Sequence, residues 1–183
     1  TRTVSMTYGS EAGNINIQSD ITGNISTPKT LTLNASGSIY GSGNISNVGN
    51  LILTSAQSNS SYAYSGIISG STNVTINGGG TINFSGANTY TGTTTISAGA
   101  LRVTGSLSDS TAVTVASGAT YNVGVNDRIA SLAGAGSVNL NSYTLTVGDS
   151  TSTTYSGAMS GTGNLTKQGL GTLILSSANS YSG

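Results

Sequence analysis

The first candidates for general acid–base chemistry in this protein are its five carboxylates. Enzymes that cleave polysaccharides use carboxylates held close together, sometimes with a lysine or arginine as base. The acids here are spread along the sequence, each near serine, glycine or asparagine, at Glu11, Asp20, Asp109, Asp127 and Asp149. Such surroundings favour carboxylates that accept hydrogen bonds in turns. We therefore predict no catalytic residue and no enzymatic activity.

The densest charged cluster is Asn126-Asp127-Arg128. An ion pair formed there on the surface would contribute little to stability. If the chain did act on a polysaccharide, Asp127 and Asp149 would be the carboxylates to replace first.

This sequence contains few side chains that could bind a metal ion or a cofactor. It contains no histidine and no cysteine, which excludes imidazole bases, thiol nucleophiles and zinc ribbons. The glycine run Gly78-Gly79-Gly80 continues with Thr81 and Ile82, where a calcium-binding repeat would need an aspartate. The acids also lack the spacing of an EF-hand. We predict no metal site and no cofactor.

Charge argues against nucleic acid as a partner. The 183 residues include only 5 Lys and Arg against 5 Asp and Glu, so the net charge is zero. A phosphate backbone requires a strongly positive surface. Serine, threonine, asparagine and glycine together supply 105 of the 183 residues.

Tyrosines recur at matching places in the chain, Tyr64 with Tyr155 and Tyr90 with Tyr181. A row of such rings could stack against sugars. The other interpretation is a corner residue, with its ring against the edge of the core and its hydroxyl outward. We favour the corner.

Threonine and asparagine patterns admit functional and structural interpretations. The pairs Thr93/Thr95, Thr144/Thr146 and Thr151/Thr153 would suit a flat ice-binding face only in register, and they are scattered along the chain. Ordinary outward strand positions explain them better. Asn-x-Ser/Thr triplets follow from composition and indicate no glycosylation; they begin at Asn24, Asn34, Asn44, Asn59, Asn73, Asn83 and Asn164. Some asparagines are expected to form internal amide ladders between stacked strands.

The elements that must position these residues are short strands. Apolar and polar residues alternate in bursts such as Thr30–Leu33, Asn73–Ile76 and Thr81–Phe84. Glycine, asparagine and serine clusters bracket each burst, as in turns. No helical periodicity is present, and Pro28 is the only proline.

Internal repeats decide the predicted architecture. Tyr64–Gly92 and Tyr155–Gly183 are identical at 15 of 29 positions, at an offset of 91 residues. A finer echo of 19 residues relates Thr95–Ala100 to Thr114–Ala119, and an offset of 91 divides into four or five turns of comparable length. We predict a right-handed parallel β-helix with roughly nine coils of about 18–23 residues, a rod about 40–45 Å long. An antiparallel β-sandwich is the alternative, but it does not explain the long echo.

The segment Gly80–Leu101, with its Ser-Gly-Ala-Asn-Thr-Tyr-Thr-Gly run, resembles the autotransporter-associated β-strand repeat, also called the passenger-associated transport repeat. A second copy begins at Gly163. We expect one β-helical segment divided into 64–154, a first repeat unit with spacer, and 155–183, the start of a second unit. Residues 1–63 are more loosely similar to filamentous-haemagglutinin-type coils.

The resemblance implies the passenger region of a large bacterial surface protein exported by a type V route. In that family the repeat is a structural, secretion-assisting element outside the cell, and the outer-membrane translocator would lie elsewhere in the full chain. This sequence would then be a fragment.

Three function classes follow, of which a stiff extracellular stalk or filament segment is preferred. Such a segment could associate with itself end to end or laterally, because Leu175–Gly183 shows no charged or proline-rich cap. The alternative is an adhesin module that contacts glycans or a cell receptor through exposed Thr, Ser, Asn and Tyr ladders. An enzyme acting on polysaccharide is the third.

Overall fold

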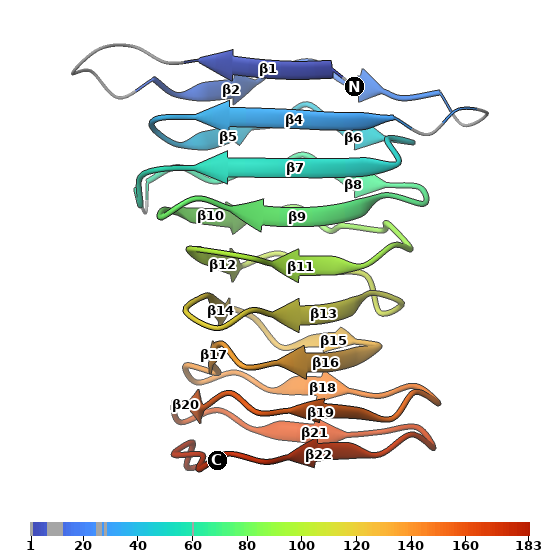
Figure 1. Ribbon diagram of the computed structural model, residues 1–183, viewed down its shortest axis with the longest axis vertical. Coiled ribbons are helices and arrows are strands. Elements are labelled where there is room, and N and C mark those ends of the chain that lie inside the picture. The colour runs from blue at the N-terminus through green and yellow to red at the C-terminus, as the bar shows by residue number, and fades with distance from the viewer. Residues whose placement is uncertain (1, 7–12, 25–26, 28, 60) are drawn as a thin grey trace.

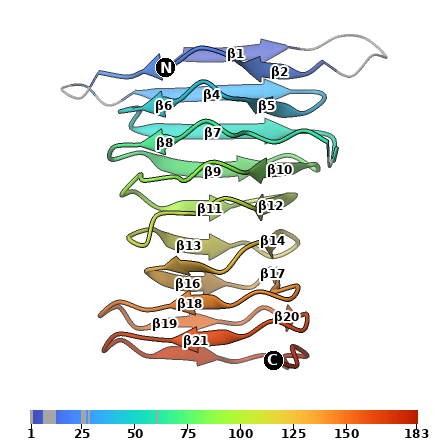
Figure 2. The same ribbon diagram turned by 180° about the vertical axis from the view of Figure 1, so that it is seen from behind.

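The chain winds into a stack of short strands with three sides. The computed structural model describes residues 2–6, 13–24, 27, 29–59 and 61–183, and these contain 22 strands and no helix. Figure 1 shows the coils stacked along the long axis, with β1 (Arg2–Met6) at one end and β22 (Leu173–Leu175) at the other. Figure 2 shows the same stack from behind.

The first side is a nine-stranded parallel sheet that runs the length of the stack. Its strands follow one another in the order β1, β4 (Thr30–Ala35), β7 (Asn50–Ser55), β9 (Asn73–Asn77), β11 (Thr94–Ile96), β13 (Ala112–Val115), β16 (Ser131–Gly134), β19 (Thr153–Tyr155) and β22.

The second side is built from two sheets. The first pairs β2 (Ile15–Ile17) with β5 (Ile39–Gly41). The other stacks β10 (Thr81–Phe84), β12 (Ala100–Val103), β14 (Thr120–Val123), β17 (Ser137–Asn139) and β20 (Met159–Ser160). Tyr64 forms parallel bridges to Gly41 and to Phe84, so it joins the two sheets across the intervening coil.

The third side is also made of two sheets. One contains β3 (Ile21–Thr22), β6 (Ile45–Ser46) and β8 (Ile68–Ser69), and the other contains β15 (Asp127–Ile129), β18 (Leu145–Val147) and β21 (Leu165–Lys167). Between them, Ala87 and Ser106 form a parallel bridge. The chain visits the first, second and third sides in turn before it begins the next coil.

Strand pairing confirms the predicted β-solenoid. Every strand pair in the described part of the chain is parallel, which rules out the antiparallel sandwich. Thr95 pairs with Thr114, so the 19-residue echo is one turn of the coil. The nine strands of the first side define about eight turns. The right-handed sense of the winding stays a prediction, as do the boundaries at 63/64 and 154/155.

The core is a set of apolar rows that run along the axis. On the first side Leu31 pairs with Leu51, Leu51 with Val74, and Val113 with Leu132, and all five side chains are buried. Because neighbouring coils lie about 4.8 Å apart, each buried side chain packs on its counterpart in the next coil. Burying one Leu or Val side chain contributes about 1.5–3 kcal/mol. A sparse but regularly spaced set of Ile, Leu and Val therefore fills a narrow core.

The 91-residue repeat does not correspond to a whole number of turns. In the first copy Val74 lies in β9 on the first side and Ile82 lies in β10 on the second. Their counterparts, Leu165 and Leu173, lie on the third and the first side. The offset spans four turns and two further sides, so each element of the second copy occupies the side before its counterpart's.

Candidate functional site

The carboxylates with a described environment are dispersed over the solenoid. Asp20 accepts the Asn44 amide at 2.8 Å, and Asp149 accepts the Thr151 amide at 2.7 Å. Both therefore satisfy backbone donors, one between coils and one within a turn. Glu11 lies outside the described residues.

Asp127 and Arg128 are adjacent in sequence, but their side chains have different surroundings in the structure. Arg128 pairs with Asp109, from the preceding coil, at 3.4 Å, and the two side chains are 48% and 65% exposed. Such an exposed pair contributes little to stability. The pairing follows from strand geometry: successive residues of β15 point to opposite faces, so Asp127 turns inward when Arg128 turns outward.

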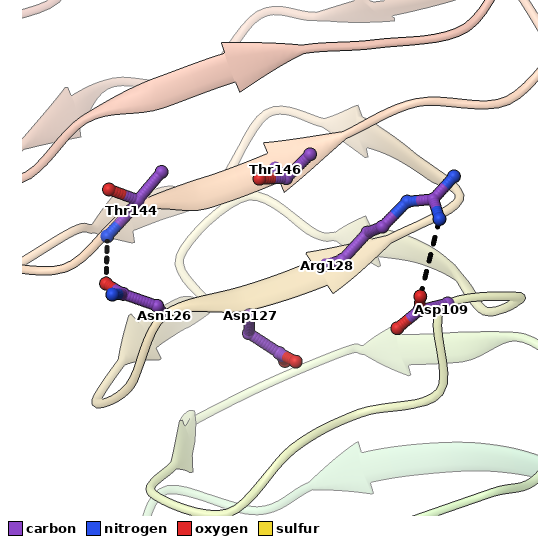
Figure 3. A pocket seen from close by; sticks show the side chains of 6 residues that line it. All are labelled: Asp109, Asn126, Asp127, Arg128, Thr144 and Thr146. Carbon is purple, nitrogen blue, oxygen red and sulfur yellow. Dashed lines mark hydrogen bonds and ion pairs between the residues drawn. The ribbon is translucent and has the colours of Figure 1, made fainter.

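Figure 3 shows the open hollow beside this cluster. Asn126 accepts the Thr144 amide at 2.8 Å, and Arg128 reaches toward Asp109. The Asp127 side chain extends away from both contacts, toward the neighbouring coil. The two acids at this place thus face different environments and do not form the convergent pair that glycoside hydrolysis uses.

Asp127 is a carboxylic acid in the core. Its side chain is 8% exposed, and its Oδ2 accepts the Leu107 amide of the preceding coil at 3.0 Å. Burial raises its pKa from 3.8 to about 6; the Leu107 and Arg128 amides oppose this rise, and the charge of Asp109 adds to it.

Polar side chains continue into the core near this acid. Tyr90 shares a hydrogen bond of 2.5 Å with Thr94, and Thr94 shares one of 3.0 Å with Thr111. The Tyr121 hydroxyl is buried without a hydrogen-bond partner, and burial raises its pKa, with the charges of Asp127 and Tyr90 adding to the effect. These side chains make the middle of the solenoid polar inside, an arrangement whose stability depends on protonation.

The repeat tyrosines point inward, so the prediction of an outward hydroxyl is wrong. Tyr64 and Tyr155 are at most 1% exposed, and each hydroxyl donates at 2.6 Å to a backbone carbonyl of the preceding coil, Gly43 or Gly136. Burial raises the pKa of Tyr155 to about 12, and the Val138 amide opposes the shift. Tyr90 is also fully buried and Tyr181 is half-buried, so these tyrosines form no exposed row for sugars.

Steric constraints explain the glycine that follows two residues after Tyr64 and two residues after Tyr155. A Cβ at Gly66 would lie 2.1 Å from the Gly43 carbonyl oxygen, and one at Gly157 would lie 1.7 Å from that of Gly136. The Tyr-Ser-Gly sequence therefore lets the backbone approach the same carbonyl that the tyrosine binds. This contact was not foreseen from the sequence, although the recurrence of Tyr-Ser-Gly was its signal.

Asparagines bond coil to coil, mostly through the backbone. Asn88 is buried and accepts the Ile68 amide at 3.0 Å, and its repeat counterpart Asn179 accepts the Met159 amide at 2.8 Å. An amide-to-amide contact of the expected ladder type joins Asn73 to Asn50 at 3.3 Å, but it is exposed rather than internal. Asn88 and Asn179 accept amides of the preceding coil, whereas the oxygens of four other asparagines accept a backbone amide of the following coil; these are Asn14, Asn44, Asn73 and Asn126.

Threonines form one row that the sequence pattern did not reveal. The pairs Thr93/Thr95 and Thr144/Thr146 lie on different sides of the solenoid, as scattered pairs should. On the first side, however, Thr75, Thr95 and Thr114 are in register over three successive coils. Ile52 and Ala133 flank them in the same row, which limits it to that length.

The described residues contain no group of three or more acidic, histidine or cysteine side chains placed to hold a metal ion. No helix long and apolar enough to cross a membrane occurs among them.

Comparison with known proteins identifies the repeats. The family model of the passenger-associated-transport-repeat matches residues 74–103 and 165–183, which confirms the resemblance inferred from Gly80–Leu101 and from the copy beginning at Gly163. The chain is also similar to the Adhesin BmaC autotransporter of Brucella suis biovar 1 (strain 1330), with 37% identity over 131 residues. That alignment covers 66% of this chain and 4% of the relative, so the chain spans a small part of its length. No solved structure matches the chain.

Proposed function

We propose that this run of passenger-associated transport repeats is a structural segment of a secreted bacterial surface protein, a stiff extracellular stalk that assists export. The nine-stranded sheet of the first side carries the proposal, because it joins all the described coils without a break. The autotransporter adhesin among its relatives supports the same assignment.

Stiffness follows from where the hydrogen bonds run. The backbone ladder of the first side joins each described coil to the next, parallel to the axis, and the shorter sheets of the second and third sides add further ladders in the same direction. Bonds from Tyr64, Asn88 and Asp127 to backbone groups one coil away reinforce them. Bending the rod would have to stretch several of these bonds at once, so the segment resists bending.

The chemistry of the chain suits a structural role outside the cell. Without histidine or cysteine, it offers few groups that titrate near neutral pH or become oxidised. The carboxylates cap turns, pair with a surface arginine or lie in the core. A structural rather than catalytic role accounts for all three placements.

Lateral self-association through the exposed residues around β22 is a secondary proposal. Leu170 is 97% exposed and Ile174 is 52% exposed, and both lie in or beside β22. Together with zero net charge, these apolar side chains favour contact with another copy of the chain. Sedimentation velocity over a rising concentration series would show growing oligomers, and replacing Leu170 and Ile174 by Thr should suppress them. A strict monomer at high concentration would contradict the proposal.

Deletion of one whole coil tests the stalk. Thr94 pairs with Val113 and with Val74, so removal of residues 94–112 lets β13 take the place of β11 on β9. The shortened chain should fold, and small-angle scattering should show a rod shorter by about 4.8 Å. In the full-length parent protein, surface display measured by antibody labelling should persist.

The matched control removes half a coil. Deletion of residues 94–103 joins one side of the solenoid to the wrong neighbour, and it should abolish both folding and display. If the whole-coil deletion kept the fold but lost display as completely as the half-coil deletion, the segment would have a role other than that of a modular stalk.

A further inference from the structure

The outer face of the second side carries a row of amide side chains with one arginine among them. Asn83 pairs with Arg102, and Arg102 pairs with Asn122, in adjacent strands of one parallel sheet. Asn122 in turn pairs with Asn139. These positions alternate with the buried core residues of the same strands, so their side chains stand on the outer face.

Arg102 has no acidic partner on this face. The strands of the second side contain no Asp or Glu, and Arg102 is their single charged residue. Other cations of the chain are engaged within it: Arg128 pairs with Asp109, and Lys167 donates to backbone carbonyls. Within the described part of the chain, no hydrogen bond or ion pair engages the Arg102 guanidinium.

A hollow opens beside Arg102. It has a volume of about 360 Å³ and is lined by Arg102, Asn122, Gly124, Asn141, Ser142 and Tyr143. Tyr143 is 37% exposed, one of the few large aromatic side chains that remain accessible. No acid lines the hollow.

The loop that forms one wall of the hollow is held in place. Asn141, in the left-handed region at φ 50°, donates its amide side chain to the Val123 carbonyl at 2.8 Å. The Tyr143 amide donates to Leu140 at 2.9 Å, and its carbonyl accepts the Asn164 amide at 3.1 Å. A ligand would therefore lose little free energy in ordering this loop.

A second aromatic surface lies along the same row. Tyr40 and Tyr62 stack with their ring centroids 4.4 Å apart and an interplanar angle of 13°. The next residue after Tyr40, Gly41, bridges to Tyr64, and Tyr64 bridges to Phe84, which places Tyr40 in the row of Asn83. The second side thus presents aromatic rings, amides and a cation in one line parallel to the axis.

We propose that this row binds an extended acidic polysaccharide whose sugars carry carboxylates. A guanidinium binds a carboxylate through two parallel hydrogen bonds, and side-chain amides bind sugar hydroxyls. Tyrosine rings pack against the apolar faces of sugars. The coil spacing of about 4.8 Å is close to the advance per residue of an extended polysaccharide, so successive sugars can meet successive coils. This binding role goes beyond the stalk and does not depend on it.

The charge of the row selects this class over other anions. One cation among neutral amides matches a single sugar carboxylate with hydroxyls around it, whereas a nucleic acid requires a dense set of cations. An acidic protein segment has the carboxylate but lacks the apolar faces of sugar rings, so tighter binding of such a segment would contradict the proposal.

Nuclear magnetic resonance of the isotope-labelled 183-residue chain provides the test. We expect a hexuronic acid oligosaccharide to shift the amide signals of Arg102, Asn122 and Tyr143, and its carboxyl-reduced neutral counterpart to bind at least tenfold more weakly. Arg102→Gln should weaken binding of the acidic oligosaccharide about tenfold, and Tyr143→Ala should weaken it several-fold. Arg128→Gln is the matched control, and it should leave the affinity unchanged.

Several results would overturn the proposal. They are equal binding of the neutral oligosaccharide, equal losses in the Arg102→Gln and Arg128→Gln variants, and tighter binding of a glutamate-rich peptide than of the oligosaccharide. The absence of any change in the amide signals of the second side would also overturn the proposal. None of these results bears on the coil deletion, so failure of the binding row and failure of the stalk are distinguishable.

Discussion

The two copies of the long repeat, Tyr64–Gly92 and Tyr155–Gly183, make the same contacts on different sides of the solenoid. In both, a tyrosine hydroxyl donates to a glycine carbonyl of the preceding coil, at Gly43 or at Gly136. In both, an asparagine oxygen accepts a backbone amide of the preceding coil. The repeated sequence therefore specifies how a coil docks on the one before it, and it leaves open which of the three sides carries each strand.

The two copies differ in how deeply the side chains that make these contacts are buried. Tyr90 is fully buried and bonded to Thr94, whereas its counterpart Tyr181 is half-buried beside the last described coil. Asn88 is buried, and Asn179 is half-buried. Identical residues thus have unequal energetic weight in the 183-residue chain, because the contribution of a contact depends on how completely it is buried.

The largest expected difference is between Tyr90→Ala and Tyr181→Ala. Removal of the buried Tyr90 ring should lower the free energy of unfolding by about 3–5 kcal/mol, because a cavity is left in the core. Removal of the half-buried Tyr181 ring should cost about 1 kcal/mol. Urea denaturation of the two variants measures the difference.

The conservative variants show which part of the tyrosine matters. Tyr90→Phe keeps the ring and loses only the bond to Thr94, so it should cost about 1 kcal/mol. Equal losses for Tyr90→Ala and Tyr181→Ala would show that both copies are equally covered, against the burial seen here.

A pH-dependent effect of intermediate size should come from the residues between the two copies and from neither copy. Neither copy contains an acid, whereas the residues between them include Asp127, whose pKa is raised by burial from 3.8 to about 6. The folded chain then holds this proton more tightly than the unfolded chain, so stability rises as pH falls from about 7 to about 4. Asp127→Asn removes the buried charge and should stabilise the chain by about 2 kcal/mol at pH 7.

The same variant contains its own control. Below about pH 4 the carboxyl of the original protein is protonated, so the two proteins should unfold at the same urea concentration. An asparagine oxygen can still accept the Leu107 amide that Asp127 binds. A stability advantage of Asp127→Asn that stayed constant from pH 4 to 7 would show that its cause is not the charge.

The smallest expected difference separates Asn88→Ala from Asn179→Ala. Both variants free a backbone amide, that of Ile68 or that of Met159. The buried site should cost about 1–3 kcal/mol because its donors and acceptors lose their partners away from water, and the half-buried site about 0.5–1 kcal/mol.

Hydrogen exchange measures these contacts one at a time. The Ile68 amide should exchange faster in Asn88→Ala, and the Met159 amide faster in Asn179→Ala, each without a change at the other site. A uniform change across the chain would mean that the asparagines stabilise the solenoid as a whole rather than their own coil contacts.

Much of the fold could be predicted from local pattern. Alternation of apolar and polar residues located strands such as Thr81–Phe84, and the 19-residue echo of Thr95 and Thr114 gave the coil. The tyrosines were misjudged because the partner that draws the Tyr64 hydroxyl inward is a carbonyl 21 residues earlier. Nothing adjacent to Tyr64 in sequence reveals that carbonyl.

The row on the second side shows the same limit. Asn83, Arg102 and Asn122 become neighbours only when their strands are aligned at offsets of 19 and 20 residues. Coils of unequal length make each offset different, since Thr120 pairs with Ser137 only 17 residues on. Sequence reasoning that assumes one fixed period cannot assemble such a row.

The mismatch between the 91-residue repeat and the coil relates the two copies by a screw operation instead of a simple translation. Each copy is advanced along the axis and rotated by one third of a circle, as Val74 on the first side and Leu165 on the third side show. Further copies at the same spacing would return to the original direction after three. A long array would then present its repeated surfaces in a spiral around the rod, so that neighbours in any direction would meet one of them.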